Sequence, residues 1–156
     1  MRKGRRGSDL LLDILDQGYD RKAWHGPTLR QSLRGVSAKT AAWRPQPGRH
    51  NIWEIAVHAA YWKYAVRRRL RGEKRGSFVL KGSNWFLPPE ELSEAAWRHD
   101  LALLESEHRK LREAVAAYLE GKTQQVPERL VFGVAFHDVY HAGQIRVLRR
   151  LQSGRS

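Results

Sequence analysis

Two histidines near the C-terminus have the spacing of a metal-binding pair. His137 and His141 lie in VFGVAFHDVYHAGQIRVLRRL, residues 131–151, which has the periodicity of one amphipathic helix. Residues four apart on a helix lie one above the other on the same face, so the two imidazoles can converge on one point. An unpaired buried polar group costs roughly 1–3 kcal/mol, and a metal ion bound by both rings would remove that cost.

A third ligand has to come from another part of the chain. His58 lies in IWEIAVHAAYWKY, which is mostly apolar apart from Glu54. We therefore expect His58, His137 and His141 to bind one divalent metal and to leave positions open for water or substrate. Three neutral ligands leave the metal its full charge, which acidifies a bound water or thiol. The alternative is that the three histidines are plain core residues with hydrogen-bond partners. A single buried histidine has this role more often than that of a metal ligand.

Two polar residues near this trio are candidates for a supporting role in catalysis. Gln144 follows His141 by three residues, so it can hydrogen-bond to a ligand imidazole or to a metal-bound water; a plain structural hydrogen bond is the alternative. Glu54 precedes His58 by one helical turn and can orient it or carry a proton, unless it only caps the helix. Asp138 points about 100° away from His137, which predicts a surface or interface position.

Four further residues are candidates for the wall of a substrate pocket. Trp85 and Phe86 lie in a long connection, residues 72–92, which can fold over the site as a lid. Trp62 follows His58 by one turn. His108 lies on the apolar seam of another helix, where a plain core position is the alternative.

Helices must position most of these residues. Long helical patterns cover residues 8–24, 52–71, 93–120 and 129–152, and shorter helical turns are expected at 27–34 and 37–43. Asn51 and Glu54 have the spacing of a capping box, and the last two long helices have seams with alternating steps of four and three. With no strand pattern, these features predict an all-α protein. We expect an up-down four-helix bundle in one domain, residues 1–156, with a basic tail at 1–7.

Composition limits the compartment and the partners. The 156 residues include no cysteine, which excludes disulfides, thiolate ligands and a cysteine nucleophile. No apolar run reaches the length of a membrane span and no signal-peptide pattern is present, so we expect a cytoplasmic protein with no membrane partner. The net charge of +13 can attract nucleic acid, but no nucleic-acid-binding motif accompanies it. Exposed Trp and Tyr on the helices favour a homodimer.

Two segments resemble a known family. WEIAVHAAYW carries His58, and HDVYHAGQI carries His137, His141 and the H-x-G-Q-I tail with Gly143. The chain resembles the DinB-like superfamily, also called DinB/YfiT-like metalloenzymes, in these segments and in the W-x-P motif of AAWRPQPGRHNIWEI, which precedes the helix with His58. The resemblance runs from about residue 8 to 152. The resemblance implies an up-down four-helix bundle with a divalent metal on three histidines. Tyr140 is a departure, because many members have a histidine there.

The resemblance also suggests a reaction class. Characterised relatives include thiol-dependent transferases and isomerases that use bacillithiol, mycothiol or glutathione. We therefore expect a bacterial metal-dependent enzyme that activates a water or a low-molecular-weight thiol cosubstrate, and hydrolyses or transfers a group on a small-molecule substrate. Zinc or nickel is the expected metal, with iron or manganese as alternatives. The alternative hypotheses are a non-catalytic metal-binding or ligand-binding bundle and, less favoured, a basic DNA-associated protein.

Overall fold

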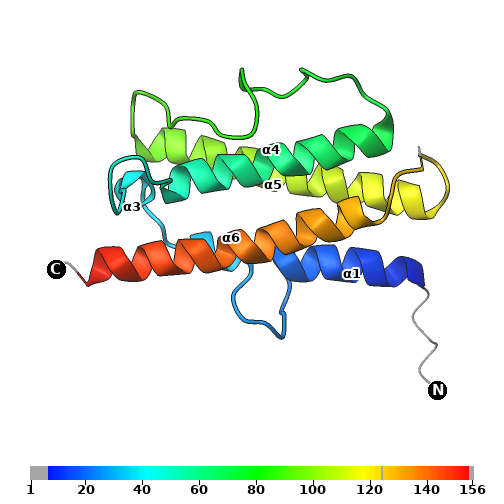
Figure 1. Ribbon diagram of the computed structural model, residues 1–156, viewed down its shortest axis with the longest axis horizontal. Coiled ribbons are helices and arrows are strands. Elements are labelled where there is room, and N and C mark those ends of the chain that lie inside the picture. Colours follow the sequence, from blue (N-terminus) through cyan, green and yellow to red (C-terminus); the bar gives the residue numbers. More distant parts are fainter. Residues whose placement is uncertain (1–6, 124, 155–156) are drawn as a thin grey trace.

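The protein is helical throughout its described part. The computed structural model describes residues 7–123 and 125–154, which form six helices and no strand (Figure 1). The helices are α1 (Gly7–Tyr19), α2 (Leu29–Leu33), α3 (Ala38–Ala42), α4 (Ile52–Arg71), α5 (Glu94–Leu119) and α6 (Arg129–Ser153). The predicted all-α class is thus confirmed. Residues 1–6 of the predicted basic tail lie outside the described residues, and Gly7 begins α1.

Local capping explains where the long helices begin and end. At the start of α4, the Asn51 side chain accepts a hydrogen bond from the Glu54 amide, and Glu54 accepts one from the Asn51 amide, so the predicted capping box is present. Gly72 ends the same helix in the left-handed conformation that glycine adopts without strain. Helix α1 ends five residues earlier than predicted, because the amides of Asp20 and Arg21 both donate to the Asp16 carbonyl and close the helix.

The directions of the four long helices differ from the predicted up-down arrangement, in which each helix runs opposite to the one before it. Helices α4 and α5 run in the same direction, since Trp53 near the start of α4 donates to Asp100 near the start of α5, and Arg71 at the end of α4 pairs with Glu113 near the end of α5. Figure 1 shows the connection between them returning along the molecule. The 20 residues of α4 span about 30 Å, which a connection of this length readily crosses.

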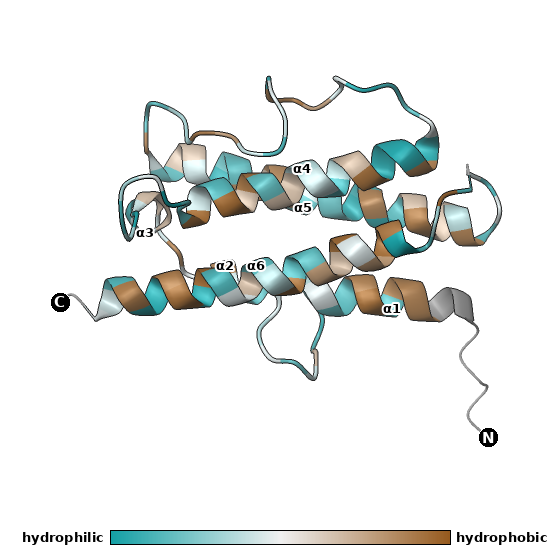
Figure 2. Ribbon diagram, in the orientation of Figure 1, coloured by the Kyte–Doolittle hydropathy of each residue, from teal (hydrophilic) through white to brown (hydrophobic). Residues whose placement is uncertain are grey.

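The packing of the long helices brings α4 and α6 together. One apolar cluster is built around the first half of α4 and includes Trp53 and Trp97. A second cluster joins α1, the end of α4, the end of α5 and the start of α6. Figure 2 shows hydrophobic and hydrophilic residues alternating along α6. The buried residues of this helix include the polar Asp138 and His141 as well as apolar residues. No helix in the described residues combines the length and apolarity needed to cross a membrane.

Candidate metal centre

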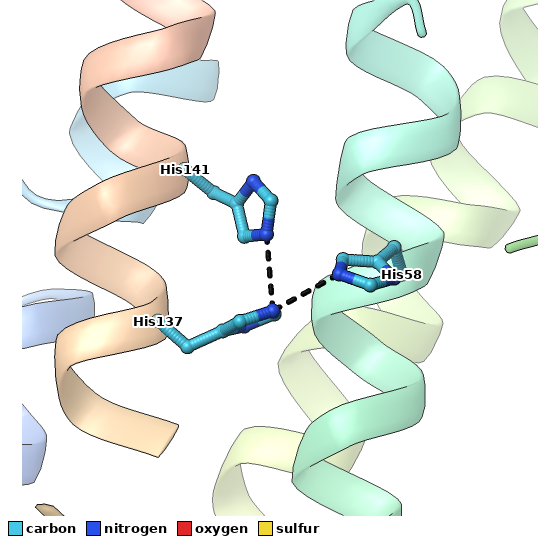
Figure 3. A group of neighbouring side chains, drawn as sticks. All are labelled: His58, His137 and His141. Carbon is cyan, nitrogen blue, oxygen red and sulfur yellow. Dashed lines mark hydrogen bonds between the residues drawn. The ribbon is translucent and has the colours of Figure 1, made fainter. Parts of the chain in front are cut away.

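The three predicted histidines meet between α4 and α6. His58 projects from α4, and His137 and His141 project from α6, with their rings turned toward one another (Figure 3). The Nε2 atom of His137 lies 3.0 Å from the Nε2 atom of His58 and 3.0 Å from that of His141. His58 and His141 are buried and His137 is partly buried. The sequence prediction that these residues converge is thus confirmed.

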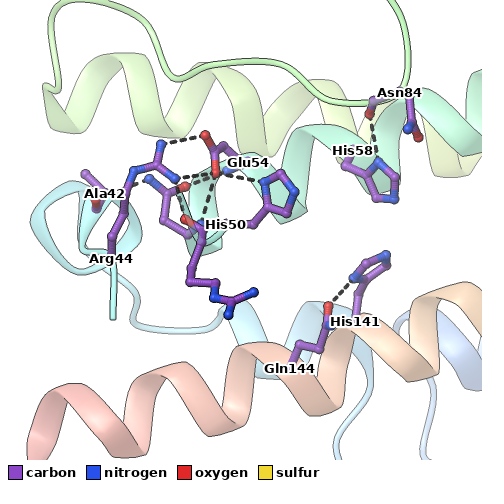
Figure 4. Close-up of polar contacts among 10 residues, drawn as sticks. Ala42, Arg44, His50, Glu54, His58, Asn84, His141 and Gln144 are labelled. Atoms are coloured by element: carbon purple, nitrogen blue, oxygen red, sulfur yellow. Dashed lines mark hydrogen bonds and ion pairs between the residues drawn. The ribbon is translucent and has the colours of Figure 1, made fainter. Parts of the chain in front are cut away.

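The hydrogen bonds around the trio force lone pairs to face each other. His58 Nδ1 lies 2.7 Å from the Asn84 carbonyl oxygen, and His141 Nδ1 lies 2.7 Å from Gln144 Oε1 (Figure 4). An oxygen of either kind only accepts, so each Nδ1 donates, and in a neutral ring the Nε2 atom then has no proton. A single proton on His137 Nε2 can serve only one of the two facing lone pairs. A cation at the meeting point would satisfy all three nitrogens.

The spacing of the nitrogens also fits a metal. With metal–nitrogen bonds of 2.0–2.1 Å, ligands at a right angle lie about 2.8–3.0 Å apart, and tetrahedral ligands lie about 3.3–3.4 Å apart. The two observed distances of 3.0 Å fall at this scale. The donor set is entirely imidazole, which suits zinc, nickel, copper or iron. We conclude that the three histidines form a group able to hold one transition-metal ion.

Burial keeps the three imidazoles neutral. Desolvation lowers the pKa of His58 to about 4, although its hydrogen bond to the Asn84 carbonyl opposes that effect. Desolvation, reinforced by the neighbouring histidines, lowers the pKa of His137 to about 3. Desolvation also lowers the pKa of His141, although its hydrogen bond to Gln144 opposes that effect. At neutral pH the rings are therefore unprotonated, which is the state that binds a metal.

We expect bound metal to be retained as the pH falls from about 7 to about 5, because protons compete for these rings only near their lowered pKa values, whereas an exposed histidine titrates near 6.5. The unfolded chain does take up protons below about pH 6.5, so the metal-free protein should lose stability over the same interval. Metal analysis after equilibration at each pH, with circular dichroism to confirm folding, checks this. Release centred near pH 6.5 from a folded protein would contradict it.

The long connection between α4 and α5 takes part in the centre directly. Trp85 stacks on His58 with ring centroids 3.7 Å apart, and on its other side it contacts His50, whose ring centroid lies 3.6 Å away. Asn84, which accepts from His58, has a φ of 66° and also accepts from Trp62 Nε1 at 3.0 Å. This segment thus sets the tautomer and the orientation of His58. The sequence predicted a lid here, but nothing in it indicated the role of Asn84.

The backbone at Asn84 provides a specific test of that role. Asparagine and glycine tolerate a positive φ, whereas a β-branched residue does not. We expect Asn84→Val to displace the carbonyl from His58 and to weaken metal binding about 10–100-fold, the usual effect of losing a hydrogen bond to a ligand histidine. Asn84→Gly is the control and should stay within a few-fold of the wild type. Zinc competition with a chromophoric chelator measures both, and equal affinities would contradict the assignment.

A pocket of about 930 Å³ opens beside the histidines. Its wall includes His141, Gln144 and Trp85 and extends along α6 to Leu151. Residues of the segment 43–50 also form part of the wall. Of the residues predicted to line a pocket, Trp85 is in this wall. Trp62 lies beside the metal centre, with its ring centroid 6.2 Å from that of His137, and lines a different hollow.

Two other predicted pocket residues lie elsewhere. Phe86 is buried against Tyr61 and Phe78 in the first apolar cluster. His108 stacks on Tyr19, with ring centroids 3.8 Å apart, and lies with Asp16 and Asp20 rather than with the three histidines. Burial lowers its pKa strongly, so it is neutral in the interior.

Glu54 holds in place residues 43–50 of the pocket wall (the entrance segment). Its carboxylate accepts from Arg44 at 2.5 and 2.8 Å, from the Asn51 amide at 3.1 Å and from His50 at 3.2 Å (Figure 4). Burial alone would raise the pKa of Glu54, but these hydrogen bonds hold it below its ordinary value. Glu54 is thus connected to the centre through His50 and Trp85, which stacks on His58.

The prediction of a surface or interface position for Asp138 is wrong, because the residue lies in the interior. Its side chain is fully buried and forms an ion pair with Lys63, which is also fully buried. The pair joins α4 to α6 next to the histidines, because Asp138 follows His137 directly. The prediction assumed that only the seam of α6 is covered, whereas α6 packs against α1 and α2 as well as α4.

Comparison with known proteins gives one family match. The family model described as the DinB superfamily matches residues 23–145, a shorter span than the residues 8–152 inferred from the sequence. The chain matches no curated protein and no solved structure. The family match covers most of the chain, including both segments that supply the histidines, and the chain therefore belongs to the DinB superfamily.

Proposed function

We propose that the protein is a metal-dependent enzyme in which His58, His137 and His141 hold one divalent transition metal, with zinc or nickel preferred and iron or manganese as alternatives. The observation that supports this most is the convergence of three Nε2 atoms, two of them with lone pairs set by Asn84 and Gln144. A metal held by neutral imidazoles lowers the pKa of a water or thiol that binds it, and so supplies a nucleophile at neutral pH.

The chain's own residues have separate tasks in this proposal. Gln144 positions His141 by accepting from Nδ1, and the Asn84 carbonyl does the same for His58. Trp85 covers one face of the His58 ring and limits the access of bulk water from that side. His141 lies in the pocket wall, so a substrate in the pocket reaches the centre from there.

The reaction class follows from what this arrangement can deliver. An activated water would hydrolyse the substrate, and an activated thiol would be transferred to it. Because the chain has no cysteine, such a thiol must come from a small cosubstrate. The pocket of about 930 Å³ is large enough for a small-molecule substrate.

Cobalt spectroscopy tests the proposal without a known substrate. We expect the full chain to bind one equivalent of cobalt(II) and its absorption spectrum to change either on addition of N-acetylcysteine or with pH near neutrality, since catalytic sites leave a coordination position open. The response to thiol or to pH tells which nucleophile is used. His58→Ala should bind no stoichiometric cobalt. A cobalt spectrum that responds to neither thiol nor pH would indicate a closed, purely structural site and contradict the proposal.

A further inference from the structure

The described wall of the pocket beside the histidines carries a positive charge and no negative charge. Among the described residues of its wall, Arg49 is the only arginine or lysine, and no aspartate or glutamate is present. No described residue pairs with the Arg49 guanidinium, whereas Arg44 of the same segment is held by Glu54. Arg49 is exposed at the edge of a largely apolar wall, and a guanidinium without an acidic partner in that position favours an anionic ligand. Three neutral imidazoles would leave the charge of a bound metal to act in the same sense.

The rest of the wall is apolar and elongated. From His141 to Leu151 it follows α6 over ten residues, which corresponds to about 15 Å. Val147 and Leu151 are apolar yet about half exposed, at 55% and 51%. Trp43 and Pro45 face the same hollow from the entrance segment. A ligand that covers these groups therefore needs an apolar body as well as an anionic group.

Gly143 leaves this part of the pocket wall without a side chain. Glycine inside a helix lowers stability relative to alanine, so its presence in α6 calls for a reason. Close packing is the reason at Gly18, where an added Cβ would lie 2.8 Å from the Ala135 carbonyl oxygen. At Gly143 an added Cβ would have no neighbour within 4 Å, and the residue is part of the pocket wall. A larger side chain at position 143 would therefore occupy part of the pocket.

We propose that the pocket binds an amphipathic organic anion, with its anionic group at Arg49, its apolar body along Val147, Leu148 and Leu151, and its reacting part toward His141. The inference deepens the proposed function, on which it rests for the identity of the reacting end. Carboxylates and phosphate esters share the required chemistry. Gly143 sets the width of the pocket and Arg49 selects the charge of the ligand.

Short-chain probes test the charge and the apolar body separately. Octanoate, octyl phosphate, octylammonium and acetate would be titrated into the zinc-loaded full chain, with Trp43 and Trp85 as fluorescent reporters in the wall and calorimetry as confirmation. We expect octanoate or octyl phosphate to bind at least about ten-fold more tightly than octylammonium and than acetate. The tighter of the two anions identifies the head group. Equal binding of octanoate, octyl phosphate and octylammonium would overturn the proposal.

Two variants locate the ligand. Arg49→Gln should remove most of the preference for the anions over octylammonium. Gly143→Leu should weaken binding of the preferred anion at least about ten-fold, while Gly133→Leu, an equally open glycine of α6 outside this wall, should bind like the wild type. Circular dichroism and metal content verify that each variant is folded. Unchanged binding in folded Gly143→Leu would overturn the proposed location.

The metal-free protein separates this inference from the proposed function. If the wild type binds no stoichiometric metal, the proposed function fails, and the same titrations on that protein still report whether Arg49 and Gly143 control anion binding. If metal binds but the anions are not preferred, the inference fails and the metal centre stands.

Discussion

Replacing His137 by alanine is expected to abolish stoichiometric metal binding. Its Nε2 atom lies 3.0 Å from each of the other two, so the variant loses the nitrogen at the middle of the group and keeps two ligands. The affinity should fall by more than the roughly 10–100-fold that accompanies the loss of a hydrogen bond to a ligand. Metal analysis of protein made without a histidine tag, followed by chelator competition, measures the change. His99→Ala is the control, because that side chain is 76% exposed on α5.

The stability of the metal-free protein distinguishes a metal centre from a hydrogen-bonded histidine cluster. In the metal-free state, His137 faces two lone pairs, and its buried Nδ1 atom has no partner among the described residues. We therefore expect His137→Ala to leave the free energy of unfolding of the metal-free protein nearly unchanged, while added zinc stabilises only the wild type. If the cluster is only structural, the variant should instead lose about 0.5–1.5 kcal/mol per hydrogen bond removed, and zinc should have no effect on either protein.

Local sequence patterns predicted the three-histidine group because the features that mark its members are local. The spacing of four positions from His137 to His141 places both rings on one face of a helix, and the apolar surroundings of His58 mark a buried position. The capping-box spacing of Asn51 and Glu54 located the start of α4 in the same way. These features depend on neighbours within about one helical turn, so they can be identified without knowledge of the tertiary structure.

The features that the sequence did not reveal all depend on contacts between distant segments. The parallel course of α4 and α5 depends on the path of residues 72–93, whose length permits either direction. The stacking of Trp85 on His58 and the hydrogen bond to the Asn84 carbonyl depend on the same path. Asp138 lies off the seam of α6, and only the packing of α6 against several helices makes that position an interior one.

Replacing Lys63 by methionine is expected to lower the free energy of unfolding by about 3–5 kcal/mol, since removing one member of a buried ion pair leaves the other charge uncompensated. Both side chains are fully buried, and Asp138 Oδ1 has no hydrogen-bond partner among the described residues. Burial lowers the pKa of Lys63 and raises that of Asp138 against their mutual attraction, so each charge depends on its partner. Urea unfolding of the metal-free protein, followed by circular dichroism, measures the loss. Arg71→Met is the control, because its partner Glu113 is exposed, and it should change stability by no more than about 1 kcal/mol.

A double variant separates the energy of the pair from the penalty of an unpaired charge. Lys63→Met combined with Asp138→Leu removes both charges and fills the space with apolar groups, so it should recover most of the stability that either single change loses. The pair joins the two helices that supply the histidines, and a double variant with full metal content would show that this junction needs packing rather than charge. A loss below about 1 kcal/mol in both single variants would instead mean that water reaches the pair, and the interior position assigned to Asp138 would then be wrong.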